Sequence, residues 1–530
     1  MTVADLVVGQ LLGAGVKTLF GVPGGGSNLD LIAAAGRAGL PFVLTSTETA
    51  AAIAAVAQAE VTGGTGACLT TLGPGAASAV NGVACAFLER APIVVFTDRQ
   101  AVNGVAEHQR IDHTALMAPI TKWSGTLGSD GVLQAMVRAL HEAKHGRPGP
   151  VHLDCPGDVA GAPLSTFVDD AFVEFEEQMP SAEDRSRVDW LVAAARKPLL
   201  LVGLGARGAG DAAAIRALCA ARKIPAMVTY KAKGIVADED EWFAGVFTNA
   251  SIEQPVLDES DLLIGIGLDP VELIPRPWTR RQPILSCNPW RVEDAHIPFA
   301  AQLLAPITEC VELIDNVSAS DWNAGRVREL VDDQKRRLSV PGAGLTAQRV
   351  VEVAASRLAA VAGHVTVDAG AHMFPATTLW PVSKPNGMLI SNGLSTMGFA
   401  LPAAVGAALV EREKPVVALT GDGGLLMCAG ELLTAVREKL RVITIVFNDA
   451  SLSLIEIKQQ ARRLDPSGVA LGAVDWAALA RSFGVTSWSA ANEAGLGRAI
   501  EGALECEGPS LIEAKIDRSN YGATLRAVRG

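Results

Sequence analysis

Residues 415–449 read PVVALTGDGGLLMCAGELLTAVREKLRVITIVFND, a stretch that predicts two short apolar strands joined by a helix over Cys428 to Lys439. Asp422 follows the first strand, and Asn448 and Asp449 follow the second. A β-α-β unit of this length places both strand ends at the carboxyl edge of one parallel sheet. Because α/β proteins bind their ligands at that edge, the stretch predicts both a fold class and the place of a site.

The same alternation of short apolar strands with Ala- and Leu-rich helices runs through the whole chain. The predicted strands are Pro41 to Thr45, Ala91 to Thr97, Pro198 to Val202, Leu262 to Ile266, Val416 to Thr420 and Val442 to Phe447. Two polar stretches, Gln178 to Asp189 and Asp332 to Gly344, are interpreted as linkers. We therefore expect an α/β protein of three doubly wound parallel-sheet domains, at about 1–170, 185–325 and 345–530, without an obvious sequence repeat.

The composition argues against several classes of protein. Lys and Arg number 45 against 57 Asp and Glu in 530 residues, and this net charge of −12 disfavours nucleic acid or an anionic membrane as a partner. The eight cysteines show no Cys-x-x-Cys spacing, so we expect reduced thiols in a cytoplasmic protein. The N-terminal sequence does not resemble a secretion signal, and no uncharged apolar run is long enough for a membrane span.

A glycine-rich loop, Gly203-Leu-Gly205-Ala-Arg-Gly208, follows the predicted strand KPLLLVG and precedes a helix. In dinucleotide-binding domains, this G-x-G-x-x-G pattern lets a pyrophosphate approach a helix N-terminus. Such domains also place an acidic residue at the end of the next strand, where this chain reads IPAMVTYKAKG and has none. The pattern favours a Rossmann-like scaffold without a nucleotide, with NAD binding or a structural nucleotide as alternatives.

Asp422 and Asp449 are the best candidates for a metal site. Their oxygens and the carbonyl of Ser451 can provide part of the octahedral coordination that Mg²⁺ prefers, and phosphate oxygens and water can complete it. Three glycines, Gly421, Gly423 and Gly424, leave backbone N–H groups free to meet those phosphates. A single Asp at a strand end more commonly caps a helix, but GDGG together with the later Asn-Asp pair favours a metal and diphosphate site.

Five further motifs are spread over the chain: GVPGG, STETAAA, TLGPG, HQRIDHTALMAPITKW and STMGFALPAAVGAAL. With these motifs and the GDG motif, nearly the whole chain resembles thiamine-diphosphate (ThDP) enzymes of the acetohydroxyacid synthase, benzaldehyde lyase and benzoylformate decarboxylase branch. The resemblance implies a pyrimidine-binding domain, a central Rossmann-like domain and a diphosphate-binding domain, all α/β. It also implies ThDP and Mg²⁺ as cofactors.

The resemblance assigns roles to four residues. Glu48, which opens an alanine-rich helix, corresponds to the catalytic glutamate that hydrogen-bonds N1′ of the cofactor pyrimidine and favours the tautomer that deprotonates C2. Met397 corresponds to the apolar wedge beneath the folded cofactor, Ser395 to a backbone carbonyl that accepts from the 4′-amino group, and His372 to a diphosphate contact. By themselves, the helix dipole explains Glu48, core packing explains Met397, and capping explains His372.

The resemblance also predicts a substrate pocket and an oligomer. Gly73, in the TLGPG turn, corresponds to a residue beside the pyrimidine, and Gln109 to an active-site glutamine. The remaining pocket residues would be Gly25, Gly26, Ser27, His113, Leu454, Ile455 and Lys458. In such enzymes the pyrimidine-binding domain of one subunit meets the diphosphate-binding domain of another. We therefore expect a homodimer or a dimer of dimers, in which Glu48 and Asp422 complete an active site across the interface.

The chain departs from the family pattern at several positions. The second metal side chain is usually Asn; the spacing here favours Asp449, with Asn448 as the alternative after a one-residue shift. Lys458 stands where acetohydroxyacid synthases have the tryptophan that selects the second keto acid, and Ile455 stands where pyruvate decarboxylases have a glutamate. The FAD-contacting segments of the synthases are not recognisable in GVFTNAS and GLDPVELIP, so FAD is not expected.

The favoured function is that of a 2-oxo acid decarboxylase that acts through a C2-ylide adduct. It would then release an aldehyde or join the enamine to a second carbonyl, in the manner of an acetolactate synthase. An aldehyde lyase or carboligase that cleaves acyloins is the main alternative, because APITKW is similar to that group. Less favoured are a nucleotide-binding oxidoreductase built on GLGARG and a catalytically idle regulatory subunit. The sequence does not identify the small 2-oxo acid or aldehyde.

Overall fold

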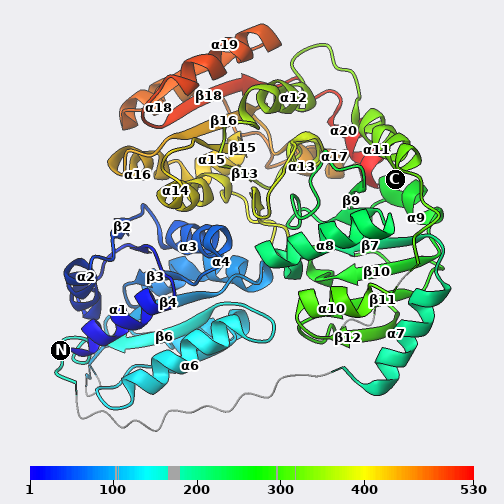
Figure 1. Cartoon of the computed structure of the whole chain (residues 1–530). Helices are drawn as coiled ribbons and strands as arrows, with labels where there is room; N and C mark the ends of the chain where they lie inside the picture. The colour runs from blue at the N-terminus through cyan, green and yellow to red at the C-terminus, as the bar shows by residue number, and fades with distance from the viewer. Residues whose placement is uncertain (102–103, 106, 165–179, 294–295, 317, 530) are drawn as a thin grey trace.

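The computed structural model describes residues 1–529 with the exception of 102–103, 106, 165–179, 294–295 and 317. The chain forms three parallel sheets of six strands each, with helices packed around them (Figure 1). Figure 1 shows them as three lobes coloured blue to cyan, green, and yellow to red, which we call the N domain, the middle domain and the C domain. The predicted fold class, three doubly wound parallel sheets, is confirmed.

The N-domain sheet has the strand order β2-β1-β3-β4-β6-β5, and all of its pairings are parallel. Its strands are β1 (Leu19–Gly21), β2 (Phe42–Leu44), β3 (Gly66–Thr70), β4 (Ile93–Arg99), β5 (Trp123–Thr126) and β6 (Val151–Pro156). Its helices are α1 (Val3–Gly13), α2 (Ser27–Ala38), α3 (Glu48–Thr62), α4 (Pro74–Leu88), α5 (His113–Met117) and α6 (Val132–Lys144).

The C-domain sheet repeats this strand order as β14-β13-β15-β16-β18-β17. Its strands are β13 (His364–Val367), β14 (Met388–Ile390), β15 (Val416–Gly421), β16 (Val442–Asn448), β17 (Thr486–Ala490) and β18 (Ser510–Lys515). Its helices are α12 (Ala347–Leu358), α13 (Met373–Leu379), α14 (Ala400–Val410), α15 (Asp422–Cys428), α16 (Glu431–Arg437), α17 (Ser453–Ala461), α18 (Trp476–Phe483), α19 (Glu493–Leu504) and α20 (Tyr521–Arg529). The TLGPG turn after β3 and the GDGG turn after β15 therefore occupy equivalent places in the two domains.

The middle-domain sheet has the order β9-β8-β7-β10-β11-β12, which is the 3-2-1-4-5-6 order of Rossmann folds. Its strands are β7 (Pro198–Val202), β8 (Ala226–Val228), β9 (Phe243–Val246), β10 (Leu262–Ile266), β11 (Ile284–Asn288) and β12 (Phe299–Leu304). Its main helices are α7 (Ala182–Ala194), α8 (Ala209–Arg222), α9 (Gln254–Asp258), α10 (Ile307–Ile314) and α11 (Ala324–Leu338).

Both predicted linkers are wrong in part, because each contains helix. The helix α7 begins at Ala182, where the Ser181 hydroxyl accepts a backbone hydrogen bond and caps the first turn. The helix α11 continues to Leu338, which is buried beneath a charged outer face. Residues 165–170, at the end of the first predicted domain, and 178–179, at the start of the first predicted linker, lie outside the described residues.

The helix after β15 also begins earlier than predicted. The helix α15 starts at Asp422 itself, with Gly421 in the N-cap position, and a break at Gly430 separates it from α16. The Asp422 carboxylate accepts a hydrogen bond from the Gly423 N–H at 2.8 Å, so one of the first free amides has a partner. A helix can therefore start within a glycine-rich segment that has low helix propensity.

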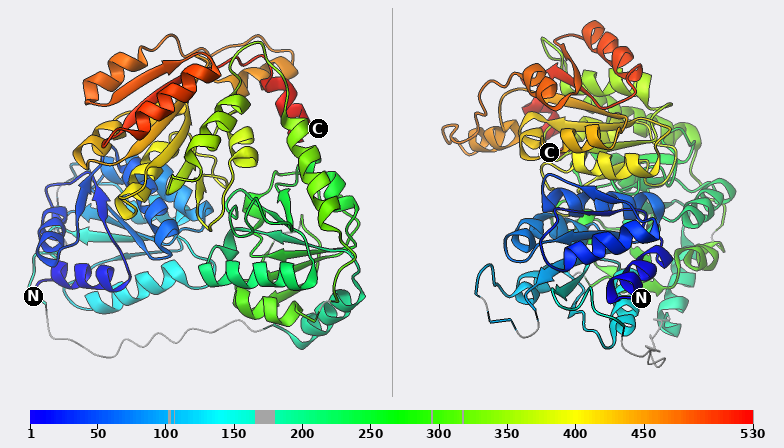
Figure 2. Two further views of the ribbon diagram at one scale, coloured as in Figure 1. Left: turned by 45° about the horizontal axis from the view of Figure 1, so that its top comes forward. Right: turned by 90° about the vertical axis from the view of Figure 1, so that its left-hand side faces the viewer.

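Helices α3 and α14 join the N domain to the C domain, as Figures 1 and 2 show. Each helix connects the second and third strands of its domain, and both are rich in buried alanine. A Cβ at Gly406 of α14 would fall 2.3 Å from the carbonyl oxygen of Ala54 in α3, so only glycine permits this approach. The helix α3 is buried on nearly all sides. Its apolar surface belongs to the protein core, and no helix of the described residues is long and apolar enough to cross a membrane.

A methyl group at position 406 tests this contact. We expect Gly406→Ala to lower the free energy of unfolding by about 1–3 kcal/mol, because the added carbon overlaps the Ala54 carbonyl. Gly9→Ala in α1 is the matched control, since no atom lies within 4 Å of the place of its Cβ. That change should raise the free energy of unfolding by about 0.5–1 kcal/mol. Urea unfolding measures both values, and equal stability of the two variants would contradict the proposed contact.

Candidate active site at the carboxyl edges of the N-domain and C-domain sheets

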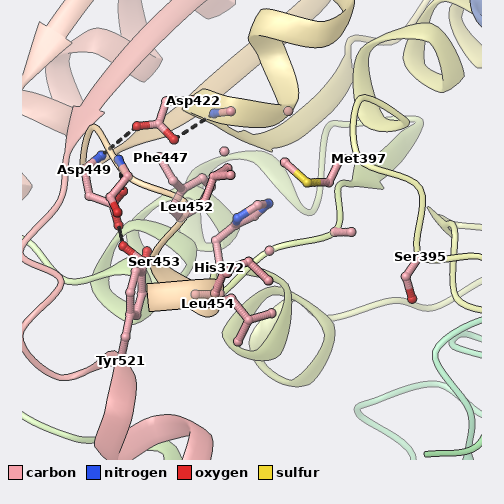
Figure 3. Close-up of a pocket in the computed structure, with 18 residues that line it drawn as sticks. His372, Ser395, Met397, Asp422, Phe447, Asp449, Leu452, Ser453, Leu454 and Tyr521 are labelled. Carbon is pink, nitrogen blue, oxygen red and sulfur yellow. Dashed lines mark hydrogen bonds between the residues drawn. The ribbon is translucent and has the colours of Figure 1, made fainter. Parts of the chain in front are cut away.

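Asp422 and Asp449 lie beside each other at the carboxyl ends of the paired strands β15 and β16 (Figure 3). One oxygen of Asp422 accepts hydrogen bonds from the N–H groups of Asp449, at 3.2 Å, and Ala450, at 2.7 Å. The Asp449 carboxylate accepts from the Ser451 N–H at 3.1 Å and from the Ser453 hydroxyl at 2.7 Å. These donors fix both carboxylates in one tight turn, in which Ala450 has a φ of 57°.

Burial destabilises the charge of both carboxylates, and Asp422 also destabilises the charge of Asp449. Burial and the negative charge of Asp422 raise the pKa of Asp449 to about 6, and burial also raises the pKa of Asp422. A divalent cation would remove this cost. No three His, Cys, Asp or Glu side chains form a metal cluster within the described part of the chain. A bound Mg²⁺ would therefore take its other ligands from the Ser451 carbonyl, water and phosphate oxygens.

Asn448 is the weaker candidate for the second metal ligand. Its amide donates a hydrogen bond to the Glu513 carboxylate of β18 at 2.7 Å. Asp449 lines the cavity beside Asp422, and Asn448 is not among the lining residues. The geometry therefore favours Asp449, the residue that the sequence spacing favours.

A cavity of about 210 Å³ opens beside the two carboxylates (Figure 3). The C-domain cofactor candidates all line it, namely His372, Ser395, Met397, Gly421, Asp422, Gly423, Gly424, Asp449 and Ser451. The substrate candidates Leu454 and Ile455 line it as well. Lys458 does not; it lies one turn further along α17 and is exposed. The structure thus gathers residues from four separate loops into one site, and their individual roles stay predictions.

His372 brings an unpaired polar atom to this cavity. Its buried ring stacks on Phe447, with 4.8 Å between the ring centres. Its Nε2 atom has no hydrogen-bond partner, and burial lowers the pKa of the ring to about 4. A Cβ at Gly421 would fall 3.4 Å from this ring, so glycine keeps the strand end open. A buried unpaired nitrogen beside an open strand end fits a site that a polar ligand completes.

Ser395 and Met397 reach the cavity from the loop between β14 and α14. Ser395 has a φ of 54°, in the left-handed region that residues other than glycine rarely adopt. The Met397 methyl carbon lies 3.4 Å from the place of a Cβ on Gly423, so its side chain extends toward the GDGG turn. Such strained backbone persists only where surrounding contacts hold it, which is common at ligand sites.

Glu48, Gly73 and Gln109 form a second group at the carboxyl edge of the N-domain sheet. Glu48 opens α3, and its Oε1 atom lies 3.0 Å from the place of a Cβ on Gly75 in the TLGPG turn. A Cβ at Gly73 would fall 2.5 Å from the Gln109 carbonyl oxygen. Gln109 has a φ of 58° and, with His113, lines a polar cavity of about 260 Å³. The TLGPG turn therefore contacts both predicted catalytic residues.

His113 positions this turn. Its Nε2 atom accepts a hydrogen bond from the Gly73 N–H at 3.0 Å, and its Nδ1 atom lies 2.9 Å from a carboxylate oxygen of Asp154. Burial alone would raise the pKa of Asp154, but hydrogen bonds from His113, His152 and Thr97 keep it well below its usual range. Both ring nitrogens of His113 are engaged, so the substrate contact predicted for it has no free polar atom.

Asp98, at the end of β4, holds the loop that contains Gly25, Gly26 and Ser27. The Ser27 hydroxyl lies 2.5 Å from Asp98 and 2.7 Å from the Cys155 carbonyl, and it is buried. The Gly26 N–H also donates to Asp98, at 3.3 Å. The Ser27 hydroxyl is therefore not available to a substrate. Gly25 is exposed and has open space at the place of its Cβ, so the substrate contact of the glycines stays a prediction.

Sequence reasoning missed Tyr521, which begins the C-terminal helix α20 and lines the C-domain cavity (Figure 3). Burial and the charges of Asp449 and Asp422 raise the pKa of its hydroxyl. No local signal marks this residue, because the two carboxylates that act on its hydroxyl, Asp449 and Asp422, precede it by 72 and 99 positions. Asp98 was also missed, although it stands at a strand end as Asp422 does.

The two groups of candidates line two different cavities. Among the described residues, the cavity beside Asp422 has no lining residue from the N domain. The cavity beside Gln109 has none from the C domain. Each domain therefore presents half of a candidate site.

The first amides of the glycine-rich loop in the middle domain are all engaged within the protein. The N–H groups of residues 203–206 all donate to acceptors within the protein, three of them backbone carbonyls. The fourth acceptor is the buried Glu272 carboxylate, which the Leu204 N–H approaches at 2.9 Å. Burial raises the pKa of Glu272 to about 8. The amides at the start of the loop therefore hold the loop against its own domain, and the absence of a nucleotide stays a prediction.

Comparison with known proteins assigns the chain to a family. Residues 1–116 match the N-terminal TPP binding domain of thiamine pyrophosphate enzymes, 187–310 their central domain, and 368–514 their C-terminal TPP binding domain. The chain is 30% identical to an acetolactate synthase of Bacillus subtilis (strain 168), over 98% of this chain and 93% of that protein. The chain belongs to the thiamine pyrophosphate enzyme family.

Two other members of this family show similar sequence identity and coverage. The catabolic acetolactate synthase of Raoultella terrigena is 30% identical, over 97% of this chain and 95% of that protein. The large subunit of acetolactate synthase isozyme 2 of Escherichia coli (strain K12) is 30% identical, over 98% of this chain and 96% of that protein. The resemblance to ThDP enzymes is thus confirmed, since thiamine pyrophosphate and ThDP are the same cofactor.

The residues present fit the cofactor of thiamine pyrophosphate enzymes. The unpaired His372 nitrogen and the open glycine turn suit a diphosphate, and the carboxylates of Asp422 and Asp449 suit a divalent cation. The two halves of the candidate site lie in the two TPP binding domains that the family models identify.

The second metal ligand can be tested directly. Residues that only orient metal ligands contribute about 10–100-fold to metal affinity, and a direct ligand should contribute at least as much. We therefore expect Asp449→Ala to weaken Mg²⁺ binding in the presence of ThDP by at least about 100-fold. Asn448→Ala is the matched control, and it should leave Mg²⁺ affinity within about threefold, because its amide bonds to Glu513. Calorimetric titration gives both values. The reverse order of effects would assign the metal to Asn448.

Proposed function

We propose that the protein decarboxylates a 2-oxo acid with ThDP and Mg²⁺, then releases an aldehyde or transfers the acyl group to a second carbonyl. The full-length similarity to proteins named acetolactate synthase supports this reaction class. When bound, ThDP supplies a carbanion that attacks the carbonyl carbon and accepts the electron pair released by C–C bond cleavage. FAD is not part of the proposal.

The residues of this chain would bind and orient the reacting groups. Asp422, Asp449 and the Ser451 carbonyl would hold Mg²⁺, and His372 and the GDGG amides would meet the diphosphate. Glu48 would hold a proton at the pyrimidine N1′, because its carboxylate adjoins the TLGPG turn and both ring nitrogens of His113, the other acid–base group there, are engaged. Gln109 would face the substrate from the neighbouring cavity.

The observation that favours an acid as substrate is the charge of the cavity beside Gln109. Arg99 and Arg110 both line this cavity, together with Gln100 and Gln109. The Arg99 side chain is half exposed and has only one terminal nitrogen near Asp154, at 3.2 Å. The same nitrogen donates to Thr126, and among the described residues no acceptor bonds to its other two guanidinium nitrogens. These nitrogens can donate to a carboxylate, which guanidinium groups bind in a bidentate manner.

An aldehyde lyase or carboligase is the second candidate. Near α17 the C-domain cavity is lined by three apolar side chains, Leu452, Leu454 and Ile455, and by Ser453, whose hydroxyl donates to Asp449. Lys458, which could pair with a carboxylate, lies outside this cavity. This half of the site suits the apolar part of an aldehyde or acyloin.

We further propose a homodimer or a dimer of dimers with active sites between subunits. Large apolar side chains are exposed on elements next to the two cavities, namely Leu29, Leu44, Leu426, Met427, Leu433 and Ile455. Exposed apolar groups of this kind mark protein interfaces. A partner subunit that covers them would place its C-domain cavity against Glu48 and complete the site.

A substrate screen tests the reaction. With ThDP and Mg²⁺, we expect CO₂ release from at least one member of a panel of 2-oxo acids. Glu48→Gln should lower kcat by about 100-fold or more, because acid–base catalysis contributes about 10²–10⁴-fold. Arg99→Gln should instead raise KM for the acid. Aldehyde release from acyloins without CO₂ from any acid would select the lyase, and activity with neither class would reject both.

Complementation tests the shared site. Glu48→Gln and Asp422→Ala homodimers should each be nearly inactive. If a site uses Glu48 of one subunit and Asp422 of its partner, then each hybrid dimer contains one intact site. Unfolding and refolding an equal mixture should therefore restore about a quarter of the wild-type activity. A mixture that stays inactive after confirmed subunit exchange would place both residues of a site in one subunit.

A further inference from the structure

Four charged side chains meet at the junction of the three domains; Glu60, Glu89 and Lys231 are buried, and Arg207 is partly buried. Glu60 of α3 and Glu89, which follows α4, come from the N domain, and Arg207 and Lys231 come from the middle domain. One Glu60 oxygen lies 2.5 Å from the Lys231 ammonium and 2.8 Å from the Arg207 guanidinium. The Lys231 ammonium also lies 3.4 Å from the Glu89 carboxylate. We call these four residues the charge cluster.

The cluster balances two negative charges with two positive ones. Burial alone would raise the pKa of Glu60, but the charges of Lys231 and Arg207 outweigh burial and lower it. Arg207 also donates to the Glu89 carbonyl at 3.2 Å, and Lys231 donates to the Ile390 carbonyl at 3.1 Å. Arg207 belongs to the glycine-rich loop, so this loop contributes to a domain junction.

Glu89 connects the cluster to the C domain. Its Oε1 atom accepts hydrogen bonds from the Gly393 N–H at 2.9 Å, the Ser391 hydroxyl at 3.2 Å and the Leu394 N–H at 3.4 Å. A Cβ at Gly393 would fall 2.9 Å from Leu88, so the loop lies directly against the end of α4. One fully buried carboxylate thus binds three donors at the start of the loop between β14 and α14.

The same loop carries Ser395 and Met397. The Ser391 hydroxyl, which donates to Glu89, also accepts a hydrogen bond from the Thr396 N–H at 3.1 Å. Asp368 holds the far end of the loop, where it accepts from the Gly398 N–H at 3.1 Å. The loop segment that carries both cofactor candidates is therefore held at one end by Glu89 of the N domain and at the other by Asp368 of the C domain.

We propose that Glu89, held in place by Lys231 and Arg207, is a positioning residue that fixes Ser395 and Met397 for the cofactor. The middle domain then contributes to the cofactor site through the charges of the cluster. This inference rests on ThDP binding but does not depend on which substrate is used.

Amide hydrogen exchange and cofactor binding test the inference. In the protein without ThDP, we expect Glu89→Ala to speed exchange of a peptide covering residues 391–399 by at least about tenfold, because three hydrogen bonds are lost. The Kd for ThDP in saturating Mg²⁺ should rise by about tenfold or more. Glu89→Gln keeps the accepting oxygen, and both quantities should return to within about threefold of wild type.

Asp269→Ala is the matched control. Asp269 is buried and pairs with Arg90 at 2.7 Å at the same junction of the N and middle domains, and no hydrogen bond joins its side chain to the described residues 391–399. It should lower thermal stability without changing loop exchange or the Kd for ThDP. Equal effects of Asp269→Ala and Glu89→Ala on the loop, or no effect of Glu89→Ala, would overturn the proposal.

Misfolding of Glu89→Ala and failure of the proposed function can each be distinguished from failure of this inference. If Glu89→Ala does not fold, Ser391→Ala decides, because it keeps the ion pairs and removes the hydroxyl that links Glu89 to the Thr396 N–H. Faster exchange and weaker ThDP binding in Ser391→Ala would support the inference, and wild-type values would reject it. Wild-type protein that binds ThDP but acts on neither substrate class would overturn the proposed function and leave this inference intact.

Discussion

The packing of α3 against α14 is the contact on which the rest of the architecture depends. Gly406 lets the backbone of α14 approach the Ala54 carbonyl, and the two helices are equivalent parts of two domains with the same strand order. Glu48 opens α3, and the loop with Met397 leads into α14. The contact therefore sets the positions of both segments that carry the main candidates for cofactor chemistry. A displacement of either helix would move both.

The sequence predicts most of the fold and the carboxylate pair of the C-domain site for one physical reason. Asp422 and Asp449 directly follow apolar strands, so local patterning and the geometry of parallel strands suffice to bring them together. The same reasoning applied to FTDRQ would have found Asp98. Tyr521 and Glu89 are different, because their partners lie far along the chain and no local pattern encodes them.

Helix boundaries and the availability of side chains were predicted less well. The segment around Ser181 is polar because α7 faces water, and polarity alone does not separate an exposed helix from a linker. Ser27 and His113 were expected to line the substrate pocket because of the resemblance to ThDP enzymes. Their hydrogen-bond partners, Asp98 and Asp154, come from other strands of the sheet, so the sequence around them does not show that their polar atoms are occupied.

The charge cluster also constrains the order in which the chain can reach its native state. During synthesis, Glu60 and Glu89 emerge before Arg207 and Lys231, and the loop amides that bind Glu89 emerge last. A nascent N domain must keep these carboxylates hydrated, because burial of an unpaired charge is strongly unfavourable. Their burial has to wait for the middle and C domains. Docking of the three domains is thus a late step, and a fragment that ends after the N domain lacks the counter-ions that its own interior requires.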